Sequence, residues 1–265
     1  SLEETSSVSA VFLDPRYRVA GGTTMTITIG WLYGASMNIY GDRGNIIALT
    51  QRAKWRGIDS DVVSIGIGDA LPSRVDIYFF GGGQDQEQIA VSRDLLGVKG
   101  ARIKADIEDG AAALTVCGGY QLFGHEYRPH NAEALPGIGI FDAVSMAGPE
   151  RFIGNVVIDS EWGEIVGFEN HSGLTHLNPG LNPMGKVRVG HGNNGKDGFE
   201  GAKYKNALGC YLHGALLPKN PAIADWLIEA GLAHSAGVSR ELSPLDDGIE
   251  RAAHATAVDR AVRTR

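Results

Sequence analysis

The sequence has only two cysteines, no long apolar run and no dense block of positive charge. A secreted disulfide framework needs more than Cys117 and Cys210, and each of these lies in an apolar stretch that is typical of a buried strand end. The apolar runs fall well short of the roughly 20 residues that cross a bilayer, and no basic start with a long apolar core marks a signal peptide. We therefore expect a cytoplasmic protein without membrane insertion.

The charge pattern argues against nucleic acid as a partner, and the glycine runs lack the motif of a phosphate loop. The formal net charge is −7, and the basic residues are dispersed, so the chain offers no electrostatic footprint for nucleic acid. Glycine runs occur, but no Gly-Lys-Ser or Gly-Lys-Thr follows them, as a phosphate loop requires. We expect no cofactor in this chain.

Glycine is abundant: 37 of 265 residues are about twice the usual share of roughly 7%. The length suits one large core, flanked by two segments of different composition. Residues 1–24, rich in Ser, Thr and Gly, are expected to be an N-terminal extension, and residues 235–265 a C-terminal tail with a helix over 249–262. Residues 25–234 then form the main domain.

Strands and helices alternate through the first half of the chain. Strands are predicted at 26–30, 61–65, 75–80 and 112–116, with helical segments over 45–56 and 86–110. This alternation predicts βαβ crossovers, and hence a three-layer α/β fold with a mostly parallel sheet between helices. After Pro136 the pattern changes to short strands and turns, with strands expected at 152–158, 165–168, 186–189 and 207–212. This half is expected to consist mainly of added antiparallel strands.

Cys117 has the context of a nucleophile. It follows the predicted strand 112–116 and precedes Gly118 and Gly119, which permit a sharp turn into a helix. A helix N-terminus favours the reactive thiolate. The alternative, a buried structural cysteine, is the commoner role of a lone cysteine, but the strand end and the two glycines favour the nucleophile.

A thiolate nucleophile needs a proton carrier, and His213 follows the apolar run 207–212, whose end should lie at the same edge of the sheet. Most other histidines lie in loops or in the tail, where a solvated or hydrogen-bonded role is usual. His171 stays open as a second candidate.

Gly81 to Gly83 directly follow the predicted strand 75–80. Loops that follow parallel strands share one crevice, so these glycines can aim backbone N–H groups at an oxyanion beside Cys117. A plain turn is the alternative for a glycine run.

Together these residues resemble the class I glutamine amidotransferases, in which the nucleophile stands in a Cys-x-Gly-x-Gln turn. Cys117, Gly119 and Gln121 match that turn. Within this class the chain resembles the cobyric-acid-synthase-like branch and, in it, the GatD family, the amidotransferase subunits of lipid II isoglutaminyl synthases. The resemblance spans about residues 25–232 and rests on the segments 40–45, 80–86, 117–122, 151–155, 167–173 and 209–214.

The resemblance implies a flavodoxin-like fold and roles for single residues. Cys117 would form a glutamyl thioester, His213 would act as base and acid, and Arg151 would hold the α-carboxylate of glutamine, for which a planar guanidinium is well suited. Gly82 and Gly83 would supply the oxyanion N–H groups.

One departure concerns the residue that orients the histidine. Many class I enzymes have a glutamate two residues after the histidine, where this chain has Ala215. The sequence therefore predicts a Cys-His dyad, steadied by another polar group, with Glu169 and Asn170 as candidates.

A polar loop follows the first predicted strand. Its residues Asp42, Arg43 and Asn45 are candidates for partner contact or for the ammonia path, or else belong to a hydrogen-bonded turn.

The implied function is that of a glutaminase subunit in a heterodimer. It would deliver ammonia from L-glutamine to a Mur-ligase-like synthetase of the MurT type, which would hold ATP and magnesium and amidate D-glutamate in the lipid II stem peptide. Its lipid-linked acceptor would bring it near the inner face of the membrane. The alternatives are an amidotransferase subunit for cobyrinic or cobyric acid or another carboxylate, a cysteine hydrolase of γ-glutamyl peptides, and a catalytically silent module of the same fold.

Overall fold

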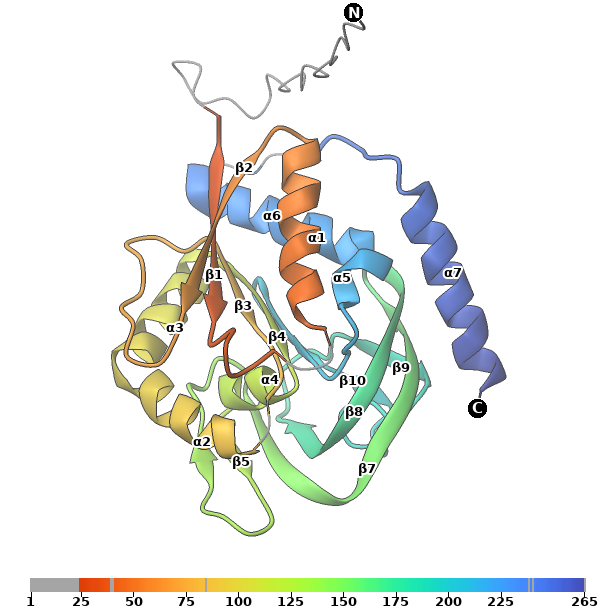
Figure 1. Ribbon diagram of the computed structural model, residues 1–265. Coiled ribbons are helices and arrows are strands. Elements are labelled where there is room, and N and C mark those ends of the chain that lie inside the picture. Colours follow the sequence, from red (N-terminus) through yellow and green to blue (C-terminus); the bar gives the residue numbers. More distant parts are fainter. Residues whose placement is uncertain (1–23, 39–40, 84, 238, 240, 265) are drawn as a thin grey trace, which may run out of the picture.

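The computed structural model describes residues 24–38, 41–83, 85–237, 239 and 241–264 (Figure 1). Two sheets organise this part of the chain. The first has the order β11-β12-β4-β3-β1-β2, and the second has the order β10-β9-β7-β5-β6, with β8 paired to β7. Residues 1–23, most of the predicted N-terminal extension, lie outside the described residues.

The first sheet is built from the predicted strands of the first half and one strand from the second. Its parallel members are β1 (Thr26–Leu32), β2 (Asp59–Ile65), β3 (Ile77–Phe80), β4 (Ala112–Val116) and β12 (Ala207–Cys210), and β11 (Ala202–Tyr204) closes the edge antiparallel to β12. Every residue of β3, β4 and β12 is buried, as expected for strands that are covered on both faces.

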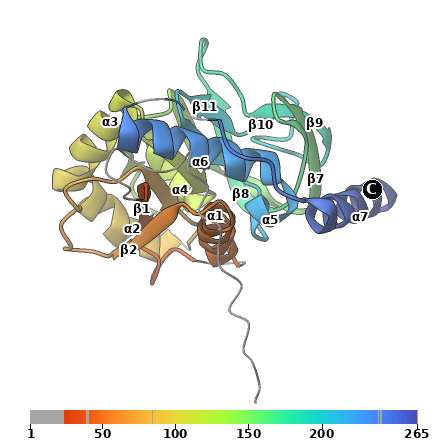
Figure 2. The ribbon, with the colours of Figure 1, turned by 90° about the horizontal axis from the view of Figure 1, so that it is seen from above.

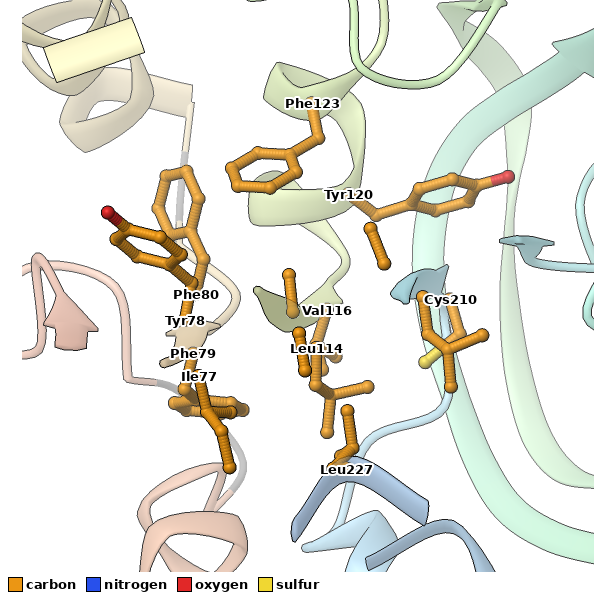
Figure 3. Packing of buried hydrophobic residues seen from close by; sticks show 14 of the residues in the cluster. Ile77, Tyr78, Phe79, Phe80, Leu114, Val116, Tyr120, Phe123, Cys210 and Leu227 are labelled. Atoms are coloured by element: carbon orange, nitrogen blue, oxygen red, sulfur yellow. The ribbon is translucent and has the colours of Figure 1, made fainter. Parts of the chain in front are cut away.

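Helices cover both faces of this sheet, and two neighbouring residues of β3 show it. Ile77 packs against Gly231 of α6 (Pro221–Ala236), whereas the Tyr78 hydroxyl donates to Asp106 of α3 (Gly100–Asp109) at 2.6 Å. Successive strand residues point to opposite faces, so α3 and α6 lie on opposite sides. Figure 3 shows the core side chains of β3 and β4 between Phe123 of α4 (Gly118–Phe123) and Leu227 of α6. The predicted three-layer α/β fold is confirmed.

The remaining helices of the first half follow β1 and β3 in the chain. They are α1 (Arg43–Trp55), α2 (Asp85–Asp94) and a short π-helical segment, Leu95–Lys99. Gly97 has non-helical ψ of −128°, so the helical segment predicted over 86–110 is divided there. The helix α6 is not among the predicted elements.

The second sheet contains the added antiparallel strands. A long hairpin of β7 (Ala143–Ser160) and β8 (Gly163–Leu177) dominates it, with an irregularity between the pairs of Ala147 and Phe152. The shorter members are β5 (Glu126–Arg128), β6 (Leu135–Pro136), β9 (Gly185–Val189) and β10 (Phe199–Glu200).

The two sheets meet at the segment that follows β12. Pairing in β12 ends at Cys210, two residues before the predicted end of that strand. The reason is that the backbone N–H of Tyr211 donates to the Glu200 carboxylate at 2.5 Å, and the N–H of His213 donates to the Phe168 carbonyl of β8 at 2.7 Å. The chain thereby leaves the first sheet and attaches His213 to the second.

The C-terminal part contains α5 (Leu216–Lys219) and α7 (Gly248–Arg263). Ala261 of α7 packs with Val157, Val166 and Val189 on the second sheet, at the end of the molecule away from α3 (Figure 2). None of the helices in the described residues is long and apolar enough to cross a membrane.

Candidate active site

Cys117 lies at the C-terminal end of β4 in a strained turn. Its φ of 52° and ψ of −108° are rare for a residue with a side chain and cost on the order of 1–3 kcal/mol. Three backbone hydrogen bonds hold the turn: Cys117 N to Cys210 O at 2.8 Å, Gly119 N to Gly81 O at 3.2 Å, and Gln121 N to Cys117 O at 2.9 Å. Cys117 is buried, with 8% of the residue exposed at the end of its strand.

The two glycines after Cys117 are required by close packing. A Cβ on Gly118 would lie 2.2 Å from Nε2 of Gln88, and one on Gly119 would lie 2.5 Å from the Phe80 carbonyl oxygen. Neither spacing leaves room for a methyl group. The Cys-Gly-Gly sequence is therefore what allows the nucleophile turn to sit directly against the glycine loop after β3.

His213 is the imidazole next to this thiol, as the sequence predicts. It is fully buried, and its Nδ1 lies 3.4 Å from Oδ1 of Asp42. Burial lowers the pKa of His213, but hydrogen bonds with Asp42 and with the Cys117 thiol, and the charges of both groups, raise it to about 10. The arrangement favours a charged imidazolium at His213, next to the Cys117 thiol.

Asp42 completes a Cys-His-Asp arrangement, and this differs from the expected support by Glu169 or Asn170. Asp42 is fully buried in the N-cap position of α1, yet its side chain makes no capping hydrogen bond. Instead its second oxygen, Oδ2, accepts the N–H of Gly82 at 2.9 Å. One carboxylate thus contacts both the histidine and the glycine loop.

Glu169 lies on β8, but its carboxylate serves another cluster. The carboxylate lies 2.7 Å from Nδ1 of His191 and accepts hydrogen bonds from the backbone N–H groups of His191 and Gly192 at 3.0 and 3.1 Å. Burial raises the pKa of Glu169, but hydrogen bonds with His171 and His191 outweigh it and lower the pKa. His171, the other candidate imidazole, lies 3.8 Å from Glu169 and stacks on Tyr211 at 3.6 Å.

The glycine loop after β3 lies beside the nucleophile. The N–H of Gly82 is bound to Asp42, and Met37 packs on Gly83 so closely that a Cβ there would lie 2.0 Å from its sulfur. Of the two glycines predicted to stabilise the oxyanion, Gly83 is therefore the one whose N–H is not bound to Asp42.

Gln121 lies one turn into α4 within a buried chain of polar groups. Its Nε2 donates to the Tyr211 hydroxyl at 3.2 Å, and its Oε1 accepts Nε2 of Gln88 at 3.0 Å. Gln88 and Tyr211 are not among the predicted site residues. Gln88 could have been suspected because it lies five residues beyond the glycine loop, on the first turns of the next helix.

The remaining predicted residues are spread around this centre. Arg43 is exposed, and Asn45 is buried in α1, where its Oδ1 accepts the N–H of Leu217 in α5 at 2.9 Å. Arg151 is exposed in the irregular part of β7, and Asn170 is half-buried on β8. Tyr40 and Gln84, which belong to two of the motif segments, lie outside the described residues. Across the described part of the chain, no three His, Cys, Asp or Glu side chains cluster so as to hold a metal ion.

Comparison with known proteins shows the family of this chain. Residues 28–221 match the model of the CobB/CobQ-like glutamine amidotransferase domain. The chain belongs to this family. It is 42% identical over 239 residues to the lipid II isoglutaminyl synthase (glutamine-hydrolyzing) subunit GatD of Staphylococcus aureus, an alignment that covers 89% of this chain and 97% of the relative.

Two further similarities extend the comparison. The GatD subunit of Streptococcus pneumoniae is 36% identical over 232 residues, which are 86% of this chain and 88% of that protein. The solved structure of PurLQS from Thermotoga maritima has a TM-score of 0.55 at 12% identity and covers 78% of this chain and 98% of that one. The latter similarity concerns the fold, which is the class I glutamine amidotransferase fold that the sequence resemblance implies.

Proposed function

We propose that this protein is the glutaminase subunit of a lipid II isoglutaminyl synthase and that it works through Cys117, His213 and Asp42. The observation that carries the proposal is a strained cysteine at a strand end, in hydrogen-bond contact with a buried histidine that a buried aspartate holds from the other side. This is the arrangement that activates a thiol for attack on an amide.

The first half of the reaction forms a thioester. The Cys117 thiolate attacks the side-chain carbonyl carbon of L-glutamine, and the electron pair of the C=O bond moves to the oxygen. As the tetrahedral intermediate collapses, the C–N bond breaks and the His213 imidazolium gives its proton to the leaving nitrogen, so that ammonia departs. His213 is then neutral.

The second half regenerates the thiol. Neutral His213 takes a proton from water, whose oxygen attacks the thioester carbonyl, and the C–S bond breaks to release L-glutamate and the Cys117 thiolate. Asp42 keeps the imidazole in one orientation and stabilises its charged form in both halves, as the aspartate of a hydrolase triad does.

Backbone N–H groups would stabilise the oxyanion. Gly118 follows the nucleophile at the start of α4, and Gly83 ends the loop after β3, so their N–H groups are the proposed donors. Gly82 would act indirectly, because its N–H holds the loop on Asp42. Arg151 is proposed from its motif as the group that binds the α-carboxylate.

The acceptor and the partner are proposed from the GatD similarity. Ammonia would pass to a Mur-ligase-like synthetase subunit that holds ATP and magnesium and converts D-glutamate of the lipid II stem peptide to D-isoglutamine. The two chains would form a heterodimer, with this chain in the cytoplasm near the membrane that carries the acceptor.

The test is reconstitution with a co-purified Mur-ligase-like subunit, L-glutamine, ATP, magnesium and lipid II. The proposal predicts glutamine-dependent conversion of one carboxylate of the stem peptide to a carboxamide, detected by mass spectrometry, and no conversion with Cys117→Ala. Amidation of a corrin carboxylate instead would favour the cobyric acid alternative. Equal ammonia release by the wild type and by Cys117→Ala would favour the catalytically silent module.

A further inference from the structure

A continuous chain of hydrogen bonds runs from the second sheet to the nucleophile turn. It starts with Ser145 and Thr175, whose hydroxyl oxygens are 2.7 Å apart, and continues through the Tyr211 hydroxyl, 2.7 Å from Thr175. Gln121 donates Nε2 to Tyr211, and Gln88 donates Nε2 to Oε1 of Gln121 at 3.0 Å. The chain fixes the direction of the Gln88 carboxamide, because its NH₂ group is committed to Gln121.

The other end of this carboxamide is an acceptor, on a side chain that contacts the nucleophile turn. Oε1 of Gln88 is buried and has no hydrogen-bond partner among the described residues, and the whole side chain is 2% exposed. Buried polar atoms are nearly always paired, so an orphaned carbonyl oxygen points to a donor that a ligand supplies. The carboxamide packs on Gly118, the residue after Cys117.

This inference rests on the proposed glutaminase function. We propose that Oε1 of Gln88 accepts a hydrogen bond from an N–H group of bound glutamine and thereby selects the substrate. L-Glutamine has two such donors, the side-chain carboxamide and the α-ammonium group. A buried acceptor discriminates strongly against a substrate that lacks the matching donor, because the acceptor then stays unpaired.

Met37 packs on the nucleophile turn beside Gln88. Its methyl carbon would lie 2.8 Å from a Cβ on Gly118, so it covers the spot where Gln88 meets the nucleophile turn. Methionine is unbranched and changes rotamer readily. A change of its rotamer is therefore the least costly way for substrate to approach Gln88.

The test compares three acyl donors with the full chain in complex with its synthetase subunit: L-glutamine, L-glutamate γ-methyl ester and glutaramate. The ester lacks the carboxamide N–H, and glutaramate lacks the α-ammonium group. The quantity measured is the ratio of kcat/KM for L-glutamine to kcat/KM for each analogue. A variant that is partly unfolded, or whose active site is distorted as a whole, has a lower kcat/KM for all three acyl donors, so both ratios stay unchanged.

For Gln88→Met we expect kcat/KM for L-glutamine to fall roughly tenfold to a hundredfold, the range of one lost hydrogen bond to a neutral or charged donor. One of the two ratios falls with it, the ester ratio if the carboxamide is the donor and the glutaramate ratio if the ammonium group is. Gln88→Glu, which keeps an acceptor oxygen, restores that ratio to within about threefold of the wild type on the same hydrogen-bond reasoning. Gln51→Met, the same change at a half-buried glutamine of α1, leaves both ratios unchanged.

Two results overturn the inference while leaving the proposed glutaminase function intact. In the first, both ratios in Gln88→Met equal those of the wild type. In the second, Gln88→Glu shows the same lowered ratio as Gln88→Met. A wild-type complex that turns over none of the three acyl donors overturns the proposed function itself, and the inference with it.

Discussion

The carboxylate–histidine clusters at Asp42 and at Glu169 differ, and only the one at Asp42 has the features of an active site. In the first, Asp42 contacts His213, and both side chains are fully buried. In the second, Glu169 contacts His171 and His191 on the second sheet. Both clusters share a buried carboxylate in contact with an imidazole.

The difference lies in what surrounds the pair. His213 contacts the thiol of a residue with φ of 52°, held at the end of a parallel strand, whereas the Glu169 carboxylate is satisfied by two backbone N–H groups and an exposed histidine. His171 and His191 pack instead on aromatic rings, Tyr211 and Phe152. A carboxylate–histidine contact thus becomes a candidate active site only where a strained nucleophile reaches the imidazole.

The largest expected effect is on the nucleophile. Cys117→Ala should lower glutaminase activity at least about ten-thousandfold, because no other group can form the thioester. Release of L-glutamate from L-glutamine by the complex measures it. Cys210→Ala is the matched control: Cys210 is fully buried on β12, where burial raises the pKa of its thiol, so this variant should keep activity within a few-fold.

The next prediction distinguishes the role of Asp42 from that of Glu169. Asp42→Ala should lower kcat about a hundredfold to ten-thousandfold, because the imidazole loses its orienting partner. Glu169→Gln should change kcat by less than about threefold, because Glu169 contacts neither Cys117 nor His213 in the proposed mechanism. Equal losses in both variants would contradict the distinction between the clusters.

A third prediction concerns pH. Burial lowers the pKa of His213, and Asp42 and Cys117 raise it to about 10, above the ordinary 6.5. A raised folded-state pKa stabilises the protein fully below pH 6.5, and this contribution is lost as the pH rises through about 10. In Asp42→Asn the loss should begin at lower pH, because the charge that raises the pKa is removed.

The measurement is the free energy of unfolding between pH 6 and 10, with the His213 ring followed by NMR. An imidazole that titrates at the same pH in Asp42→Asn and in the wild type would contradict the assignment of Asp42 as its partner.

The smallest effect is on stability at the second cluster. Glu169→Gln should lower the free energy of unfolding by about 1–3 kcal/mol, because an amide cannot accept from all the donors that now meet the carboxylate. Denaturant unfolding at neutral pH measures it. A loss of activity without a loss of stability would show that the cluster takes part in the reaction.

Much of the fold and of the nucleophile turn is predictable from the sequence, because local patterns encode them. The alternation of apolar strands with helices predicts the layers, and a cysteine between an apolar strand and two glycines predicts the nucleophile turn. His213 was predictable because the apolar run before it had to end at the same sheet edge as Cys117. These features lie within short stretches of chain.

The orienting carboxylate was harder to predict, because it depends on a contact between residues 171 positions apart. Asp42 stands where an aspartate ordinarily caps a helix, so the turn interpretation was reasonable. Only the fold shows that its oxygens are used elsewhere. Glu169 is closer in sequence to His213, and its backbone neighbour Phe168 does pair with His213, but its side chain extends to His191.

The most direct measurement is covalent trapping of the complex with a glutamine-mimicking diazoketone, followed by peptide mapping and kinetics. The account predicts an adduct on Cys117 and none on Cys210, with a trapping rate that falls at least about a hundredfold in Asp42→Ala and less than about threefold in Glu169→Gln. An adduct on another residue, or equal trapping rates in Asp42→Ala and the wild type, would contradict it.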